Sequence, residues 1–143
     1  MKLTHTQNMK ASKSGMTLLE LTVVILVLLS LISILFIGAR AWKKGSDRAA
    51  SILQIRNVQQ AVRSFSNMNG LNPGDTIATL DSEIFGAGKF IENSPVGTHP
   101  AGGDLAFAVA APTVIPNVGT LYLSVTGTDA ADYEPTVGTA SDW

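Results

Sequence analysis

The chain has 143 residues, a formal net charge of −1 at pH 7 and no cysteine. Its length leaves room for one small domain beyond a long apolar segment. The lack of cysteine excludes disulfides, thiolate nucleophiles and metal sites built on sulfur. A small exported domain without disulfides then needs support from a long helix or from burial in an assembly.

The first element is an apolar segment that follows a short basic leader. The leader occupies residues 1–15 and ends at Gly15, and the segment at residues 16–39 carries one charge, Glu20. At 1.5 Å per residue the segment gives roughly 36 Å of helix, enough to cross a hydrocarbon core about 30 Å thick. We therefore expect residues 16–39 to span a membrane.

Glu20 needs its own explanation, because a charge in hydrocarbon costs several kcal/mol unless it lies near the interface or finds a partner. Thr17 and Glu20 have the spacing of a capping box. In that arrangement Glu20 lies in the first helical turn, bonds free backbone N–H groups and favours the positive end of the helix dipole. The carboxylate would then lie at headgroup depth.

Around this glutamate, a glycine, Thr-Leu-Leu and the acid occur in register in the run Gly15-Met16-Thr17-Leu18-Leu19-Glu20-Leu21. The run resembles the class III leader and cleavage site of type IV pilins and type II secretion pseudopilins. The resemblance implies that a membrane prepilin peptidase cuts between Gly15 and Met16 and N-methylates Met16. It also implies that Glu20 pairs with the terminal amine of a neighbouring subunit during assembly.

The orientation in the membrane also comes from this resemblance, which places the leader in the cytoplasm and the residues after about 40 outside. Basic residues flank the apolar run on both sides, so the positive-inside rule does not decide it. Two alternatives stay open for the N-terminal segment. One is an ordinary secretory signal cut before Trp42, although the apolar core is long for one. The other is an uncleaved anchor.

A second helical pattern follows the apolar run without an intervening proline. Residues 40–68 are amphipathic, and one continuous helix from about Met16 to about Met68 is predicted. Its apolar stripe should pack the rest of the chain on one side, while Arg56 and Arg63 lie on a flank that faces water or a neighbour. The apolar positions recur at spacings of three and four: Ile52, Ile55, Val58, Val62 and Phe65. Gly38 and Gly45 are weak points where a bend or local melting is expected.

The rest of the chain, residues 69–143, should form a small globular head. Turn formers end the helix with Gly70 near its C-cap, and a short helix is predicted from Asp81. Alternation predicts antiparallel strands at 105–109 and 119–126, with 114–115 as a third contributor. In the second strand Leu121, Leu123 and Val125 should share the apolar face, with Tyr122, Ser124 and Thr126 on the other.

The stretch from Phe90 to the first strand, with its Pro-Ala-Gly-Gly turn at 100–103, also resembles a group of short pilin-like proteins. That resemblance is weaker than the one at the leader, and the cysteines often found in the group are absent here. The tail at 128–143 is polar and acidic and is predicted to be a surface loop. Trp143 should be either tucked back or at a contact.

Charge is unevenly distributed along the chain. Beyond Phe65 the only Lys or Arg is Lys89, against nine Asp and Glu residues, so the head should not bind nucleic acid. We predict no enzyme and no cofactor, because no nucleophile and base form a recognised motif and His99 sits alone in a loop, where we expect it to be solvated. The weak candidates for a calcium site are the carboxylates of the tail, Asp129, Asp132 and Glu134.

The expected fold is α+β and pilin-like, a long N-terminal helix packed on a small antiparallel sheet. The expected function is a structural subunit of a type IV pilus-like filament. Its expected partners are prepilin peptidase, other copies of itself, the inner-membrane assembly machinery and, before assembly, membrane lipid. It would cross the inner membrane once and then join an extracellular or periplasmic filament. The alternatives are a pseudopilin or minor pilin of a type II secretion system, and a monomeric membrane-tethered binding module.

Overall fold

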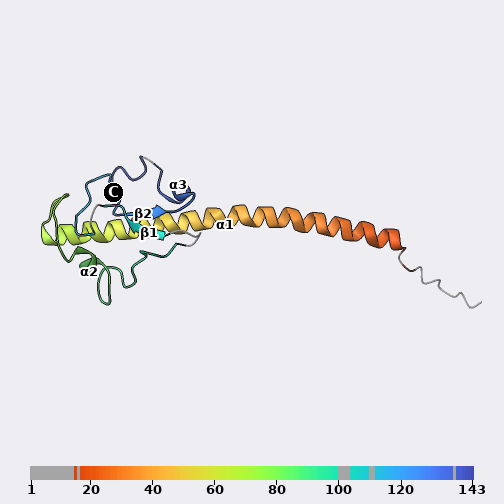
Figure 1. Ribbon diagram of the computed structural model, residues 1–143, viewed down its shortest axis with the longest axis horizontal. Helices are drawn as coiled ribbons and strands as arrows, with labels where there is room; N and C mark the ends of the chain where they lie inside the picture. The colour runs from red at the N-terminus through yellow and green to blue at the C-terminus, as the bar shows by residue number, and fades with distance from the viewer. Residues whose placement is uncertain (1–14, 16, 100–103, 110–111, 137) are drawn as a thin grey trace, which may run out of the picture. The chain divides into compact units, whose positions relative to one another are not determined.

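The computed structural model describes residue 15 and residues 17–99, 104–109, 112–136 and 138–143. The elements follow the order α1 (Leu18–Asn69), α2 (Leu80–Ile84), β1 (Asp104–Phe107), β2 (Leu123–Thr126) and α3 (Ala130–Tyr133) (Figure 1). The chain divides into two compact units, Met1–Arg40 and Ala41–Trp143. A long N-terminal helix and a small antiparallel sheet confirm the expected α+β class.

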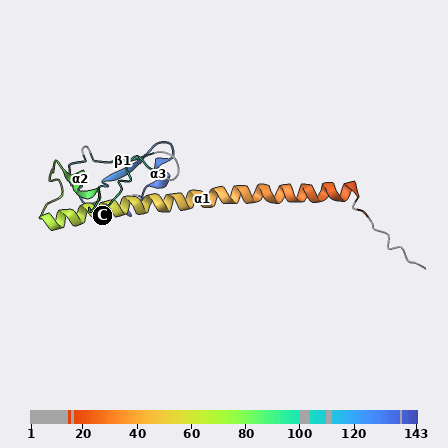
Figure 2. The ribbon, with the colours of Figure 1, turned by 90° about the horizontal axis from the view of Figure 1, so that it is seen from below.

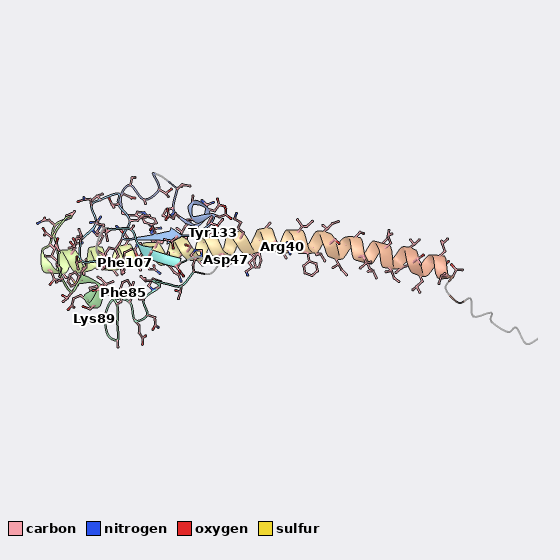
Figure 3. All side chains as sticks on the ribbon, viewed as in Figure 1. Arg40, Asp47, Phe85, Lys89, Phe107 and Tyr133 are labelled. Carbon is pink, nitrogen blue, oxygen red and sulfur yellow. The ribbon has the colours of Figure 1, made fainter. Side chains whose placement is uncertain are left out.

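In the first unit, α1 exposes an uninterrupted apolar surface. Every residue from 18 to 40 is exposed, and Figure 3 shows the side chains before Arg40 projecting on all sides of the helix. The mean hydropathy of an 18-residue window reaches 3.0, and none of that window is buried. By length and composition α1 is therefore a candidate membrane span, in agreement with the expectation for residues 16–39.

The expected leader lies outside the described residues except for Gly15. The turn at 100–103, which carries the weaker resemblance to short pilin-like proteins, also lies outside them. The helical conformation of α1 continues through Gly38 and Gly45, so local melting at these glycines is not observed.

In the second unit, one face of α1 forms one side of the hydrophobic core. The predicted stripe supplies Ile55, Val58 and Val62, each at most 1% exposed. Figure 2 shows α2 and the strands beside this part of the helix. Burying each such side chain contributes about 1.5–3 kcal/mol. The partners of the stripe in the core cluster come from α2, both strands and the connecting segments: Leu80, Ile84, Leu105, Ile115, Tyr122, Leu123 and Val125.

The helix ends in the way its turn residues predict. Gly70 has φ +63 and follows Asn69, the last residue of α1. The Leu71 N–H donates to the Ser66 carbonyl at 2.9 Å, and the Gly70 N–H donates to the Asn67 carbonyl at 3.5 Å. These two bonds make a Schellman motif, whose left-handed residue is most easily a glycine. The predicted C-cap at Gly70 is confirmed.

The sheet has two antiparallel strands and is shorter than predicted. β1 and β2 pair with Leu105 opposite Val125 and Phe107 opposite Leu123. The third contributor does not join them, because Val114 forms an isolated antiparallel bridge with Thr76 instead. Among the described residues the sheet therefore consists of β1 and β2 alone.

The position of Tyr122 corrects the predicted alternation. Leu123 and Val125 are buried as expected, but Tyr122, assigned to the opposite face, is fully buried as well. Tyr122 precedes β2, so the two-residue period of a strand does not apply to it. Its ring packs edge-to-face on Phe107 at 5.4 Å, and its hydroxyl donates to the Pro112 carbonyl at 2.5 Å.

Candidate functional site

Glu20 and Thr17 form a reciprocal pair at the start of α1. The Thr17 N–H donates to Glu20 Oε2 at 2.8 Å, and the Glu20 N–H donates to Thr17 Oγ1 at 3.3 Å. The capping box predicted from the spacing of these residues is confirmed. It holds the carboxylate at the N-terminal end of the helix, where the positive end of the helix dipole favours negative charge.

The other predicted residues of this site are described only in part. Gly15 is exposed and outside regular structure. Met16, the predicted site of cleavage and methylation, lies outside the described residues. The second carboxylate oxygen of Glu20, Oε1, has no hydrogen-bond donor among the residues that the structure describes. One oxygen of the carboxylate thus caps the helix while the other is available to a further donor.

Three hydroxyl groups of the apolar run are satisfied within the helix. The hydroxyls of Thr22, Ser30 and Ser33 each donate at 2.8 Å to a backbone carbonyl three or four residues earlier. Each of these three hydroxyl donors therefore keeps a hydrogen-bond partner even inside a bilayer, where lipid tails offer no acceptor. This local geometry is compatible with either lipid or a packed bundle of helices around the segment.

A buried glutamine joins α1 to the segment that leads into β2. Gln59 is 2% exposed; its Nε2 donates to the Thr120 carbonyl at 3.0 Å, and its Oε1 accepts from the Tyr122 N–H at 2.9 Å. The amide thereby pairs with backbone groups that the two-stranded sheet leaves unpaired. Sequence reasoning missed Gln59, although its position four residues after Ile55 and three before Val62 places it on the buried stripe.

Arg56 and Arg63 contact the end of the tail. Arg63 Nη2 donates to the Trp143 carbonyl at 3.0 Å, and the Arg56 guanidinium lies 5.3 Å from the Trp143 ring centroid. Burial lowers the pKa of Arg63. The expectation that these arginines face water or a neighbour holds for Arg56, which is exposed, but not for Arg63, which is half-buried because the tail folds back against it. Of the two placements predicted for Trp143, the tucked-back one is observed.

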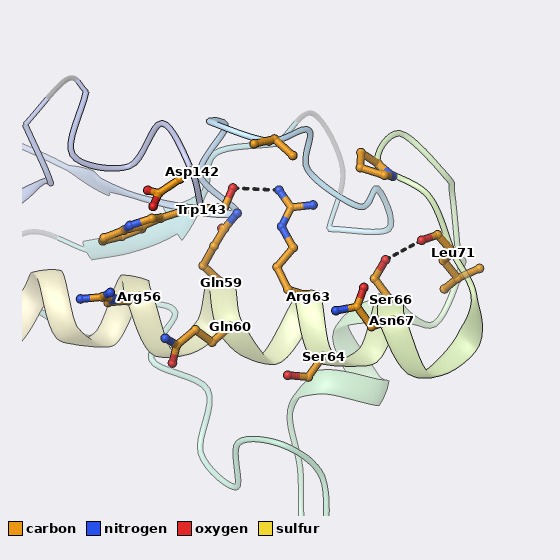
Figure 4. A pocket seen from close by; sticks show the side chains of 12 residues that line it. Arg56, Gln59, Gln60, Arg63, Ser64, Ser66, Asn67, Leu71, Asp142 and Trp143 are labelled. Carbon is orange, nitrogen blue, oxygen red and sulfur yellow. Dashed lines mark hydrogen bonds between the residues drawn. The ribbon is translucent and has the colours of Figure 1, made fainter.

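A groove of ≈ 710 Å³ runs along this arginine flank. Figure 4 shows Gln60 and Ser64 beside it and the hydrogen bond from Arg63 to Trp143. The Gly119 N–H also donates to the Trp143 carbonyl, at 3.2 Å. Both donors compete with any ligand for this carbonyl, and the arginine is already engaged. The groove is therefore mainly the place where the end of the tail packs against α1.

The three carboxylates proposed as a weak calcium site are not brought together. Asp132 Oδ2 lies 2.6 Å from Lys44 Nζ, whereas Glu134 Oε1 accepts from the Val125 N–H at 2.7 Å. Asp129 is exposed and has φ +64. Within the described part of the chain, no group of three or more His, Cys, Asp or Glu side chains has the arrangement of a metal site. The tail is also not only a loop, because it contains α3.

The ion pair between Lys44 and Asp132 links α1 to α3. The hydrogen bond from Lys44, followed by the attraction of its charge, holds the pKa of Asp132 below its usual range, and the same contacts raise the pKa of Lys44. Arg48 further lowers the pKa of Asp132. Both paired side chains are about half exposed, so solvent screens their attraction. The pair positions α3 more than it stabilises the fold.

His99 lies between α1 and α3 rather than in open solvent. Its Nε2 is 3.1 Å from the hydroxyl oxygen of Ser51, which is fully buried, and its ring stands edge-to-face on Tyr133 at 5.0 Å. The expectation of a solvated histidine is wrong. The contacts instead give His99 a packing role.

No family model matches the chain, and neither a curated protein nor a solved structure matches it.

Proposed function

We propose that the chain is a structural subunit of a type IV pilus-like filament. Prepilin peptidase cuts the bond between Gly15 and Met16 and methylates Met16, and the subunit waits in the inner membrane through its apolar helix. It then polymerises, with the helices inside and the heads outside. The proposal rests on the leader motif together with the position of Glu20, held by its capping box at the start of an exposed apolar helix.

The driving force is packing of the apolar helix. Residues 21–37 leave lipid for a bundle of neighbouring helices. Lipid tails are as apolar as these side chains, so the attraction between the helices comes from close van der Waals packing. A lone carboxylate would oppose this transfer, because an unpaired charge in a dry interior is costly. Glu20 Oε1, which has no donor among the described residues, accepts from the Met16 amine of an adjacent subunit, so the two charges enter the bundle as a pair.

Three variants separate the capping role of Glu20 from its charge. Glu20→Gln keeps a capping-box side chain but removes the charge, and Thr17→Ala removes the cap but keeps the charge. Glu20→Ala removes both. We expect filaments, counted by electron microscopy at matched protein levels, from Thr17→Ala but not from Glu20→Gln or Glu20→Ala. If either Glu20→Gln or Glu20→Ala forms normal filaments without wild-type subunits present, no charge pair is needed.

Processing has its own test in the mass of the N-terminal peptide of the protein purified from its host. A start at Met16 with one added methyl group supports the action of prepilin peptidase. A start at Met1 would leave an uncleaved anchor, and a start at Trp42 would leave a secreted domain. Either of these would overturn the filament proposal.

Two related or competing functions use the same features. A pseudopilin or minor pilin of a type II secretion system is processed in the same way. It differs from the main subunit of a filament because it is less abundant and forms no long surface filaments. A monomeric membrane-tethered binding module would instead use the acidic head as its working surface. Crosslinking in the membrane separates the classes, because only the module stays monomeric.

A further inference from the structure

Trp42 is an exposed aromatic side chain on the helix of the second unit. It is 80% exposed, and Lys43 beside it makes no ion pair with any residue that the structure describes. A tryptophan this exposed in a folded unit is unusual, because Trp buries 150–250 Å² when it finds a contact and is enriched at the centres of interfaces. We propose that Trp42 of one copy inserts into a groove beside Phe90 of a second copy.

The groove lies farther along the same helix and has a volume of ≈ 460 Å³. Val58, Phe90, Ile91 and Pro95 contribute apolar side chains to its lining, which also includes polar residues such as Asn57 and Asn93. Phe90 is 43% exposed and stands edge-to-face on Phe65, with ring centroids 6.4 Å apart. An inserted ring therefore meets both apolar and polar side chains, with Phe90 as an aromatic neighbour, which suits an amphipathic ring such as indole.

Gln54 also lines the groove, and its Oε1 is shielded from water with no hydrogen-bond donor in the described chain. A buried acceptor without a donor is unfavourable. If Gln54 turns its amide toward an occupant of the groove, the indole N–H of tryptophan can donate to it, whereas phenylalanine has no donor.

The charges at the two surfaces are complementary. Lys43 is exposed beside Trp42, and the neighbouring Lys44 is already neutralised by Asp132. At the groove, Glu92 is exposed next to Ile91 and has no ion-pair partner in the described residues, while Lys89 is neutralised by Glu83. Among the described residues, Lys43 thus brings a positive charge without an ion pair beside Trp42, and Glu92 brings a negative charge without an ion pair beside the groove, as at a polar interface rim.

The geometry excludes insertion of Trp42 into the groove of its own chain. The groove residues of α1 begin at Gln54, so Trp42 lies about 18 Å or more away along a straight helix. The contact therefore joins different patches on two copies, and a contact of this heterologous kind repeats without closing unless its rotation forms a ring. This inference rests on the proposed filament and names a contact between its subunits outside the membrane.

A disulfide experiment tests the contact with Trp42 left in place. The chain has no cysteine, so Lys43→Cys and Glu92→Cys introduce the only thiols. A disulfide needs Cα atoms within about 7 Å, and Lys43 lies about 16 Å along the helix before Gln54, the first helix residue of the groove beside which Glu92 lies. On oxidation in host membranes, we expect the double variant to form a ladder of covalent multimers. Each single variant should stay monomeric, and the two singles produced together should stop at dimers.

Further substitutions in the double-cysteine chain identify the side chain responsible. Trp42→Ala should lower the multimer yield about tenfold or more, as for a central interface residue, and Trp42→Phe should lower it less. Leu53→Ala is the matched control, because Leu53 is 57% exposed on the same helix and does not line the groove. Its ladder should be unchanged.

The outcomes distinguish this contact from the filament itself. Filaments seen by electron microscopy without a ladder, or a ladder that survives Trp42→Ala, would overturn the inference and leave the proposed function standing. Dimers from Lys43→Cys alone would indicate a symmetric contact and would also overturn it. Quenching of Trp42 only by brominated lipid would assign the residue to the membrane surface instead. If the experiments yield no filaments and no covalent multimers, both the contact and the proposed function are overturned.

Discussion

Gln59 and Tyr122 are joined by a hydrogen bond in which the Tyr122 N–H donates to Gln59 Oε1 at 2.9 Å, inside the core where both residues are at most 2% exposed. The same amide donates to the Thr120 carbonyl. A helix side chain thus takes the place of a strand neighbour just before β2, and it positions the strand on α1.

The first prediction concerns this amide. Gln59→Leu leaves the buried Tyr122 N–H without an acceptor, and we expect it to destabilise the second unit by about 2 kcal/mol. Near-UV circular dichroism during denaturant unfolding measures the change. Gln60→Leu, one position along on the exposed side, should change stability by no more than about 0.5 kcal/mol. Equal effects of the two substitutions would contradict the assigned role.

Tyr122 gives a prediction in alkaline solution. Burial, aided by the negative charge of Asp81, raises its pKa from 10.0 to about 12. The unfolded chain therefore loses this proton first, so the contribution to stability is present below pH 10 and is lost as the pH rises toward 12. Ultraviolet titration should show a tyrosine that ionises near pH 12 and is missing from Tyr122→Phe. Its ionisation near pH 10 in the folded protein would contradict the burial.

The ion pair of Lys44 and Asp132 predicts an acid titration. Because Lys44 lowers the pKa of Asp132, the anchoring of α3 should be intact above the usual carboxyl pKa of 3.8 and should be lost as the pH falls through the lower folded value. The Asp132 carboxyl resonance followed by NMR should titrate below 3.8, and Lys44→Gln should raise its midpoint. Lys43→Gln, which removes a cation that has no ion pair among the described residues, should leave the midpoint in place.

The Arg63 contact predicts how the tail is held. Arg63→Gln removes a charged donor from the Trp143 carbonyl and should destabilise the docked tail by roughly 1–2 kcal/mol. In a Trp42→Phe background, Trp143 fluorescence should shift to the red and iodide should quench it more strongly. Arg56→Gln removes only the contact with the ring and should have the smaller effect. Unchanged quenching in Arg63→Gln would mean that the Gly119 N–H holds the tail by itself.

Local signals in the sequence were sufficient for the helix and its two ends. The capping box joins Thr17 to Glu20, and the Schellman motif joins Ser66 to Leu71, so each lies within five residues of chain. The spacing of Ile55, Val58 and Val62 likewise follows from the helical period alone. These features depend on neighbours in the sequence, and a single chain carries all of that information.

The head required the tertiary structure. Lys44 and Asp132 are 88 residues apart, and Arg63 and Trp143 are 80 apart, so no periodicity connects them. The alternation around Tyr122 predicted the wrong face because β2 begins only at Leu123, and the backbone just before it bonds to Gln59 of α1 instead of to a strand. The sequence by itself determined an apolar, capped helix and its amphipathic continuation, because short-range geometry controls both. Only the tertiary structure decided which polar groups of that helix face the head, because those contacts depend on how distant segments pack.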